Sequence, residues 1–135
     1  MKIPHTPPRA MFENTLEARR RRRLDDPHAW IAALHGPPAI RDEALAELRE
    51  LLLRGARFEL SRSRQGLSQL RQAALEDLAV EATDDALRTV LARLGSFRAA
   101  SRFTTWASKF VLHIARHKLR AALAGVADDA ETILS

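Results

Sequence analysis

Apolar residues recur every three or four positions along most of the chain, which is the spacing that places them on one face of a helix. The clearest stripe consists of Leu45, Leu48 and Leu52 with the neighbouring Leu51, and it predicts a helix over about residues 40–60. No stretch alternates between apolar and polar residues as a half-buried strand does. We therefore expect an all-α fold, a compact bundle of four main helices with an N-terminal helical extension.

Capping and breaking residues place the boundaries of the first helices. Asp26 and Pro27 are the residue types favoured at an N-cap and at the first helical position, so a short helix is expected from there to about His35. A glycine and two prolines then stop it. Residues 10–24 are a candidate helix within the extension, and they include five consecutive arginines at positions 19–23.

Two longer helices are predicted in the second half of the chain. Residues 61–66 are polar and indicate a loop. A long helix then covers about residues 68–94, and Gly95 is placed to end it in a left-handed C-cap. A last helix is expected over about residues 102–123, terminated by Gly125. The core stripe of the long helix is expected to be Leu75, Leu78, Ala82, Ala86 and Val90.

Charge is arranged in blocks along the chain. Residues 76–87 hold five acidic residues and no basic one, whereas residues 88–120 hold eight basic residues and no acidic one. Such blocks indicate either two contact surfaces or two solvated helix faces. The arginine run is either a solvated helix end or a source of nonspecific attraction to DNA. We expect a basic N-terminal extension (1–26), a helical domain (27–124) and the start of an acidic linker (125–135).

The residue content excludes several classes of function. Cys is absent, which excludes disulfides, Fe–S clusters and a Cys nucleophile. No apolar run approaches the roughly 20 residues of a membrane span, and no signal-peptide core is present, so we expect a soluble cytoplasmic protein without membrane contact. His113 and His117 have metal-ligand spacing, but Arg116 lies between them and repels a cation. Neither a metal, a cofactor nor an enzymatic activity is expected.

The last predicted helix, with Ser101 as its cap, carries the most informative pattern. At about 100° per residue, six polar residues share an arc of roughly 80°, and Trp106 lies at its border. Cations attract phosphates, and aromatic rings beside them offer a stacking surface to unpaired bases. The alternative is that the rings belong to the core and the cations only solubilise the helix. The polar face comprises Arg102, Thr105, Lys109, His113, Arg116 and Arg120, and the apolar face Phe103, Ala107, Phe110 and Ile114.

The second half of the chain resembles a known family of transcription factors. Residues 76–81 read EDLAVE, residues 91–98 read LARLGSFR, and residues 101–110 read SRFTTWASKF. This series is similar to the second conserved region of bacterial extracytoplasmic-function (ECF) sigma factors. The pattern there is roughly DL-x-QE, then L-x-x-F-R-G-x-S-x-F-x-T-W and a basic helix. The likeness extends over about residues 27–123, through the order of helices as well as the motif.

The resemblance implies an RNA polymerase sigma factor domain that acts in transcription initiation. The long helix would dock on the clamp helices of the largest subunit of core RNA polymerase. The loop and last helix would recognise and melt the promoter minus-ten element and hold its non-template strand. The polymerase-binding residues would be Asp77, Glu81, Asp84 and Arg88. The DNA-binding residues would be Phe97, Arg98, Ser101, Arg102, Phe103, Thr104, Thr105, Trp106, Lys109, His113, Arg116, His117 and Arg120.

The chain also departs from the family pattern. Val80 stands where the family has Gln, and Ala99 or Ala100 stands where it has a loop Gly. His113 replaces a common Asn, and the helix-turn-helix that reads the minus-thirty-five element has no counterpart. These departures leave a second interpretation open, a degenerate sigma-like helical module that binds a protein such as an anti-sigma factor and does not bind DNA. A helical RNA-binding protein is a third alternative.

Overall fold

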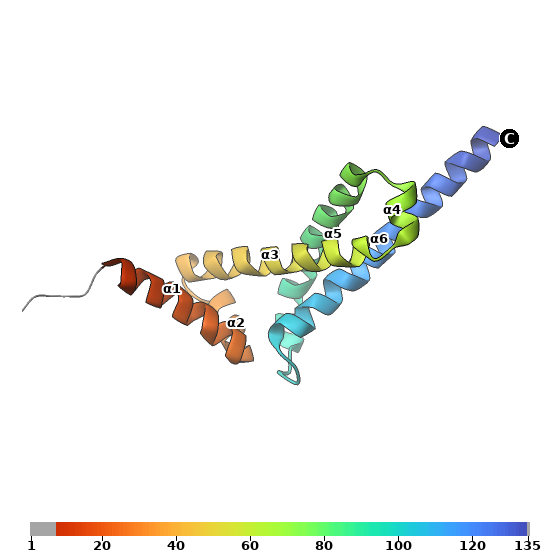
Figure 1. Cartoon of the computed structure of the whole chain (residues 1–135). Helices are drawn as coiled ribbons and strands as arrows, with labels where there is room; N and C mark the ends of the chain where they lie inside the picture. The colour runs from red at the N-terminus through yellow and green to blue at the C-terminus, as the bar shows by residue number, and fades with distance from the viewer. Residues whose placement is uncertain (1–7, 135) are drawn as a thin grey trace, which may run out of the picture.

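The computed structural model describes residues 8–134, apart from the side chains of residues 8–15, Asp25 and Leu134. Within these residues the chain forms an all-α fold without strands, as predicted. Its elements are α1 (Pro8–Asp25), α2 (Pro27–Leu34), α3 (Pro38–Ser61), α4 (Arg64–Gln69), α5 (Gln72–Ala92), the 3-10 helix η1 (Leu94–Ser96) and α6 (Phe103–Leu134) (Figure 1). None of these helices is both long and apolar enough to cross a bilayer. The first seven residues of the predicted extension lie outside the described part.

Helices α3, α5 and α6 form the centre of the fold, because each buries one stripe of side chains against the other two. Small residues let the helices approach closely. A Cβ atom added to Gly55 of α3 would lie 3.1 Å from Val111 Cγ1 of α6. Helix α2 covers one end of this core through Trp30, and α6 continues beyond the bundle at the other end (Figure 1). The buried stripe of α6 is Phe103, Ala107, Val111, Ala115 and Leu119.

The predicted start of α2 is confirmed. The Asp26 carboxylate accepts a hydrogen bond from the backbone N–H of His28 at 2.9 Å, and Pro27 is the first helical residue. This cap satisfies one of the free N–H groups of the first turn. The predicted core stripe of α5 is confirmed except at Leu78, which is half-buried while the neighbouring Ala79 is buried.

The loop predicted over residues 61–66 is wrong, because a short helix, α4, begins inside it. The Ser63 hydroxyl accepts a hydrogen bond from the backbone N–H of Gly66 at 2.9 Å and caps this helix. Gly66 is buried, and a Cβ atom there would lie 3.0 Å from Leu119 Cδ1 of α6. Contact with α6 therefore stabilises a turn that has no helical pattern of its own. As a result α5 begins at Gln72, later than predicted.

The predictions that Gly95 and Gly125 end helices are wrong. Helix α5 ends at Ala92, and Gly95 lies in η1 without a positive φ. The left-handed conformation occurs instead at Ala99, with φ 57°. At Gly125, α6 continues without a break and nothing crowds the backbone within 4 Å. One glycine in an exposed helix costs only about 1 kcal/mol relative to alanine, which the flanking helix-forming residues offset.

Candidate nucleic-acid interface

One side of α6 is an exposed face formed mainly by basic residues. Its position follows from the opposite side, where every fourth residue from Phe103 to Leu119 is buried against α3 and α5. The predicted inward face was rotated slightly from the observed one, because Phe110 and Ile114 are half-buried and Val111 takes the central place. The exposed face comprises Arg102, Thr105, Lys109, His113, Arg116 and Arg120, all of which were predicted to share it.

Five aromatic rings form a continuous cluster at the start of α6. Phe97 and Phe103 lie 5.5 Å apart between centroids, and Trp106 lies 5.1 Å from Phe97 and 5.6 Å from Phe103. Phe110 meets Trp106 edge to face at 5.0 Å, and Trp30 of α2 stacks on Phe103 at 5.0 Å. Trp106 and its neighbours Phe97 and Phe110 are half-buried, so their rings reach the surface.

Phe103 must be removed from the residues expected to contact DNA directly. Its side chain is 1% exposed and lies beneath Trp30, so no base can stack on it. Of the other predicted DNA-contact residues, Phe97, Ser101, Thr104 and Trp106 are half-buried, and Arg98, Arg102, Thr105, Lys109, His113, Arg116, His117 and Arg120 are exposed.

A hollow of about 470 Å³ lies between α5 and α6 beside this face, within the range of volumes that ligand pockets have. Its lining includes Lys109, Phe110 and His113 from α6, Thr89 from α5 and Arg93 directly after α5, and no acidic residue. The Arg93 guanidinium lies 5.8 Å from the centroid of the Phe110 ring. Arg93 was not among the predicted DNA-contact residues, although it belongs to the same acid-free block, because it lies at the end of α5 and not on the basic face of α6.

Arg116 has an acidic neighbour that the sequence did not indicate. Its Nε donates a hydrogen bond to Glu59 Oε1 of α3 at 2.8 Å, and the Glu59 carboxylate also pairs with Arg62 at 3.4 Å. The Arg116 guanidinium is therefore partly neutralised by Glu59 within the fold. Among the described residues, Arg102, Lys109 and Arg120 form no ion pair.

The loop before α6 is held by local hydrogen bonds. Arg98 donates a hydrogen bond to the Gly95 carbonyl at 2.9 Å, and Ser96 Oγ donates one to the Arg93 carbonyl at 2.7 Å. The Ser101 hydroxyl donates to the Arg102 carbonyl at 3.3 Å, so it does not form the N-cap bond that its type suggests. These contacts turn the chain between α5 and α6 and leave the Arg98 side chain at the surface.

The two histidines of α6 lie side by side at the surface. The rings of His113 and His117 are 4.5 Å apart between centroids, edge to face, and both side chains are exposed. No group of three or more His, Cys, Asp or Glu side chains suited to a metal ion occurs among the described residues. Two imidazoles alone leave a zinc ion short of the ligands that its usual sites provide.

The acidic block of α5 mostly pairs with neighbouring basic residues. Lys118 of α6 donates to Asp85 at 2.9 Å and lies 3.9 Å from Glu81. The pKa of the Asp85 carboxyl is lowered, chiefly by the hydrogen bond from Lys118, while burial opposes the shift and Arg88 adds to it. The pKa of Glu76 is also lowered by its hydrogen bond from Arg57 of α3.

The predicted polymerase-binding residues do share one face of α5. Asp77, Glu81 and Arg88 are exposed, and Asp84 is half-buried. Arg49 of α3 donates to Asp84 at 3.4 Å, and Arg88 pairs with the Asp85 carboxylate one turn earlier. Asp77 forms no ion pair with another described residue, so it and Glu81 carry the least neutralised charge of this face.

Comparison of the sequence with protein-family models and curated proteins, and of the fold with solved structures, finds no match.

Proposed function

We propose that this chain is a sigma factor domain that docks on core RNA polymerase and opens the promoter minus-ten element, acting by binding without covalent chemistry. One observation carries the proposal: an acid-free hollow with an aromatic wall opens beside the exposed basic face of α6. Phosphates bind best to cations without competing carboxylates, and unpaired bases stack on rings that reach the surface. Both requirements are met within two turns of one helix.

The backbone of the single strand would follow the unpaired cations of α6. Arg102, Lys109 and Arg120 are exposed and free of carboxylate partners among the described residues, so they neutralise phosphates at little desolvation cost. An unstacked base would enter the hollow beside Phe110 or lie on the half-buried Trp106 ring. Because stacking tolerates any base, this part of the site supports affinity more than sequence choice.

The acidic face of α5 is proposed as the polymerase contact. Asp77 and Glu81 lie four residues apart on an exposed helix face, where they can accept hydrogen bonds from a basic partner helix. The arginines and lysines of the clamp helices in the family's polymerase are the partner that the resemblance implies. Asp84 and Arg88 border this pair and are already engaged within the chain.

The proposal is tested by two binding experiments on the 135-residue chain, an oligonucleotide titration and a polymerase pull-down. Fluorescence anisotropy with labelled minus-ten oligonucleotides should show tighter binding to single-stranded than to duplex DNA, and core RNA polymerase should be retained on the immobilised chain. Lys109→Ala should weaken every oligonucleotide, whereas Arg41→Ala, an exposed arginine of α3, serves as the charge-matched control. Equal affinity for random duplex and single strand would contradict the DNA part of the proposal.

A protein-interaction module that has lost DNA binding is the second candidate. It is favoured by the pairing of Arg116 with Glu59 and by the strained Ala99 in the loop that would hold the DNA. Retention of a protein partner such as an anti-sigma factor, together with no binding of any single strand at low salt, would select it.

A further inference from the structure

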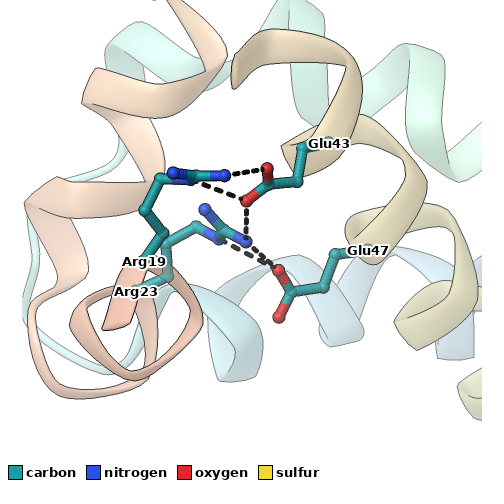
Figure 2. A network of polar contacts seen from close by, with 4 residues as sticks. All are labelled: Arg19, Arg23, Glu43 and Glu47. Atoms are coloured by element: carbon teal, nitrogen blue, oxygen red, sulfur yellow. Dashed lines mark hydrogen bonds and ion pairs between the residues drawn. The ribbon is translucent and has the colours of Figure 1, made fainter. Parts of the chain in front are cut away.

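The arginine run of α1 is divided by the fold into two kinds of side chain. Arg19 and Arg23, one helical turn apart, point toward α3, where Arg19 forms a bidentate pair with Glu43 at 3.1 and 2.7 Å (Figure 2). Arg20 and Arg22 are exposed, and Arg21 lies near Glu17 on α1 itself. Two of the five arginines therefore form ion pairs with α3 within the fold. Neither predicted role of the arginine run, a solvated helix end or nonspecific attraction to DNA, included such pairs.

Arg23 is the most buried charged side chain among the described residues, at 3% exposed. Its guanidinium pairs with the Glu47 carboxylate, with Nε–Oε2 at 3.0 Å, and reaches Glu43 at 3.4 Å (Figure 2). A buried cation held by two carboxylates on a neighbouring helix has a fixed position, because each displacement breaks a charge-assisted hydrogen bond.

This fixed guanidinium lies over the ring of Trp30, with its central carbon 5.3 Å from the ring centroid. Trp30 is 1% exposed, and its indole N–H has no hydrogen-bond partner within the described structure. The orientation of the Trp30 ring is therefore set by its packing contacts, and Arg23 and Phe103 provide two of them. The Trp30 and Phe103 rings stack at 5.0 Å with an interplanar angle of 19°.

Phe103 is the first residue of α6, so its position sets the first turn of the helix that carries the basic face. Its ring contacts Phe97 at 5.5 Å and Trp106 at 5.6 Å. An unbroken series of contacts thus joins the carboxylates of α3 to the two half-buried rings at the candidate interface. The series passes through Arg23, Trp30 and Phe103, none of which is exposed.

We propose that Arg23 is a positioning residue for the nucleic-acid face, and that it holds Trp106 in its binding orientation through Trp30 and Phe103. The inference rests on the proposed function of α6 for its effect on binding, but not for its effect on Trp106. Arg23 itself is too buried to touch a phosphate. Its removal should lower affinity without altering the number of phosphates neutralised.

The experiment uses the whole chain labelled with 5-fluorotryptophan. The chain contains two tryptophans, so two ¹⁹F resonances are expected, and Trp30→Phe assigns them. Arg23→Met keeps an apolar side chain over Trp30 but removes the ion pairs. Arg22→Met makes the same charge change at an exposed position of the same helix and is the matched control.

We expect Arg23→Met to shift or broaden the Trp106 resonance and Arg22→Met to leave it unchanged. Single-strand affinity should fall about fivefold or more in Arg23→Met, near the lower end for losing one stacked base, with the same salt slope as the parent chain.

An unchanged Trp106 resonance in a folded Arg23→Met chain would overturn the inference, as would equal affinity losses in the two methionine variants. If Arg23→Met fails to fold, Arg23→Met/Glu47→Met removes the stranded carboxylate as well, and the same readouts apply. Absence of oligonucleotide binding by the parent chain would instead contradict the proposed function, because the resonance of Trp106 is measured without DNA.

Discussion

Glu59 and Arg116 lie 57 positions apart in the chain, and their side chains meet at 2.8 Å between Oε1 and Nε. Glu59 is 9% exposed on α3, whereas Arg116 is 49% exposed on the basic face of α6. Glu59 of α3 thus places a carboxylate beside the basic face of α6, whose own residues include no acidic side chain. The cations of this face are therefore not equivalent, which leads to the first two predictions.

Replacing the buried carboxylate should release Arg116 for phosphate binding. Glu59→Gln is expected to strengthen binding of all oligonucleotides and to steepen the dependence of log K on log salt by about 0.7, the value for one additional single-strand contact. Stability should fall by about 1 kcal/mol, because the buried Glu59 side chain loses a charge-assisted hydrogen bond. Anisotropy titrations at several salt concentrations measure the slope, and a slope equal to that of the parent chain would contradict the assignment.

Removal of an unpaired cation should have a larger electrostatic effect than removal of Arg116. Lys109→Ala is expected to flatten the salt slope by about 0.7 for every oligonucleotide, and Arg116→Ala by less. Trp106→Ala should leave the slope unchanged while weakening single-strand binding by roughly 1–3 kcal/mol for the stacked base lost, and Trp106→Phe, which keeps a ring, should weaken it less. The same titrations, preceded by thermal unfolding of each variant, compare the three effects.

Charge reversal on α5 tests the polymerase contact. Asp77→Lys/Glu81→Lys should abolish retention of core RNA polymerase but keep the fold, since exposed charges contribute little to stability. Asp42→Lys/Glu50→Lys makes the same charge change on exposed positions of α3 and is the control. Undiminished retention by the α5 variant in a pull-down would exclude this face as the docking surface.

Acid should destabilise the fold through its ion pairs. The hydrogen bond from Arg19 lowers the pKa of Glu43, although burial opposes the shift. A carboxyl with a lowered folded-state pKa stabilises the fold fully above its unfolded pKa of about 4.3, and this stabilisation is lost as the pH falls through the lower folded value. Glu43→Gln should therefore lower the Tm at pH 7 and flatten its decline between about pH 5 and 3, unlike Glu50→Gln. Thermal unfolding by circular dichroism over this range measures both.

The loop before α6 offers a stabilising substitution. Ala99 has φ 57°, a conformation that costs a residue with a Cβ atom roughly 1–2 kcal/mol. Ala99→Gly should raise the free energy of unfolding by up to about 1 kcal/mol, because relief of strain exceeds the added entropy of the unfolded chain. Ala100→Gly, without that backbone conformation, should lower it. Urea unfolding of both variants provides the comparison.

The features that the sequence predicts well are those with a local physical cause. The cap at Asp26, the all-α fold and the exposed face of α6 follow from residue types within a few positions of each other. The role of Phe103 could not be predicted in this way, since periodicity gives its side of the helix but not the Trp30 ring that covers it.

Long-range partners account for the remaining differences. Five arginines in a row give no local signal that Arg23 will be buried and Arg22 exposed. The distinction arises because Glu43 and Glu47 of α3 meet only one side of α1. Likewise, nothing near Arg116 in the sequence indicates Glu59, and only contact between α3 and α6 brings them together.

Helix α6 continues through Gly125 without a break, so its C-terminal part projects beyond the bundle as one rigid segment. Residues 120–134 lie beyond its buried stripe and span about 22 Å at 1.5 Å per residue. A tilt of about 10° where the helix leaves the bundle would move its far end by about 4 Å over that length. A fluorophore at Ile133, whose side chain is 83% exposed, would therefore magnify small rotations of the basic face into distances that energy transfer can resolve.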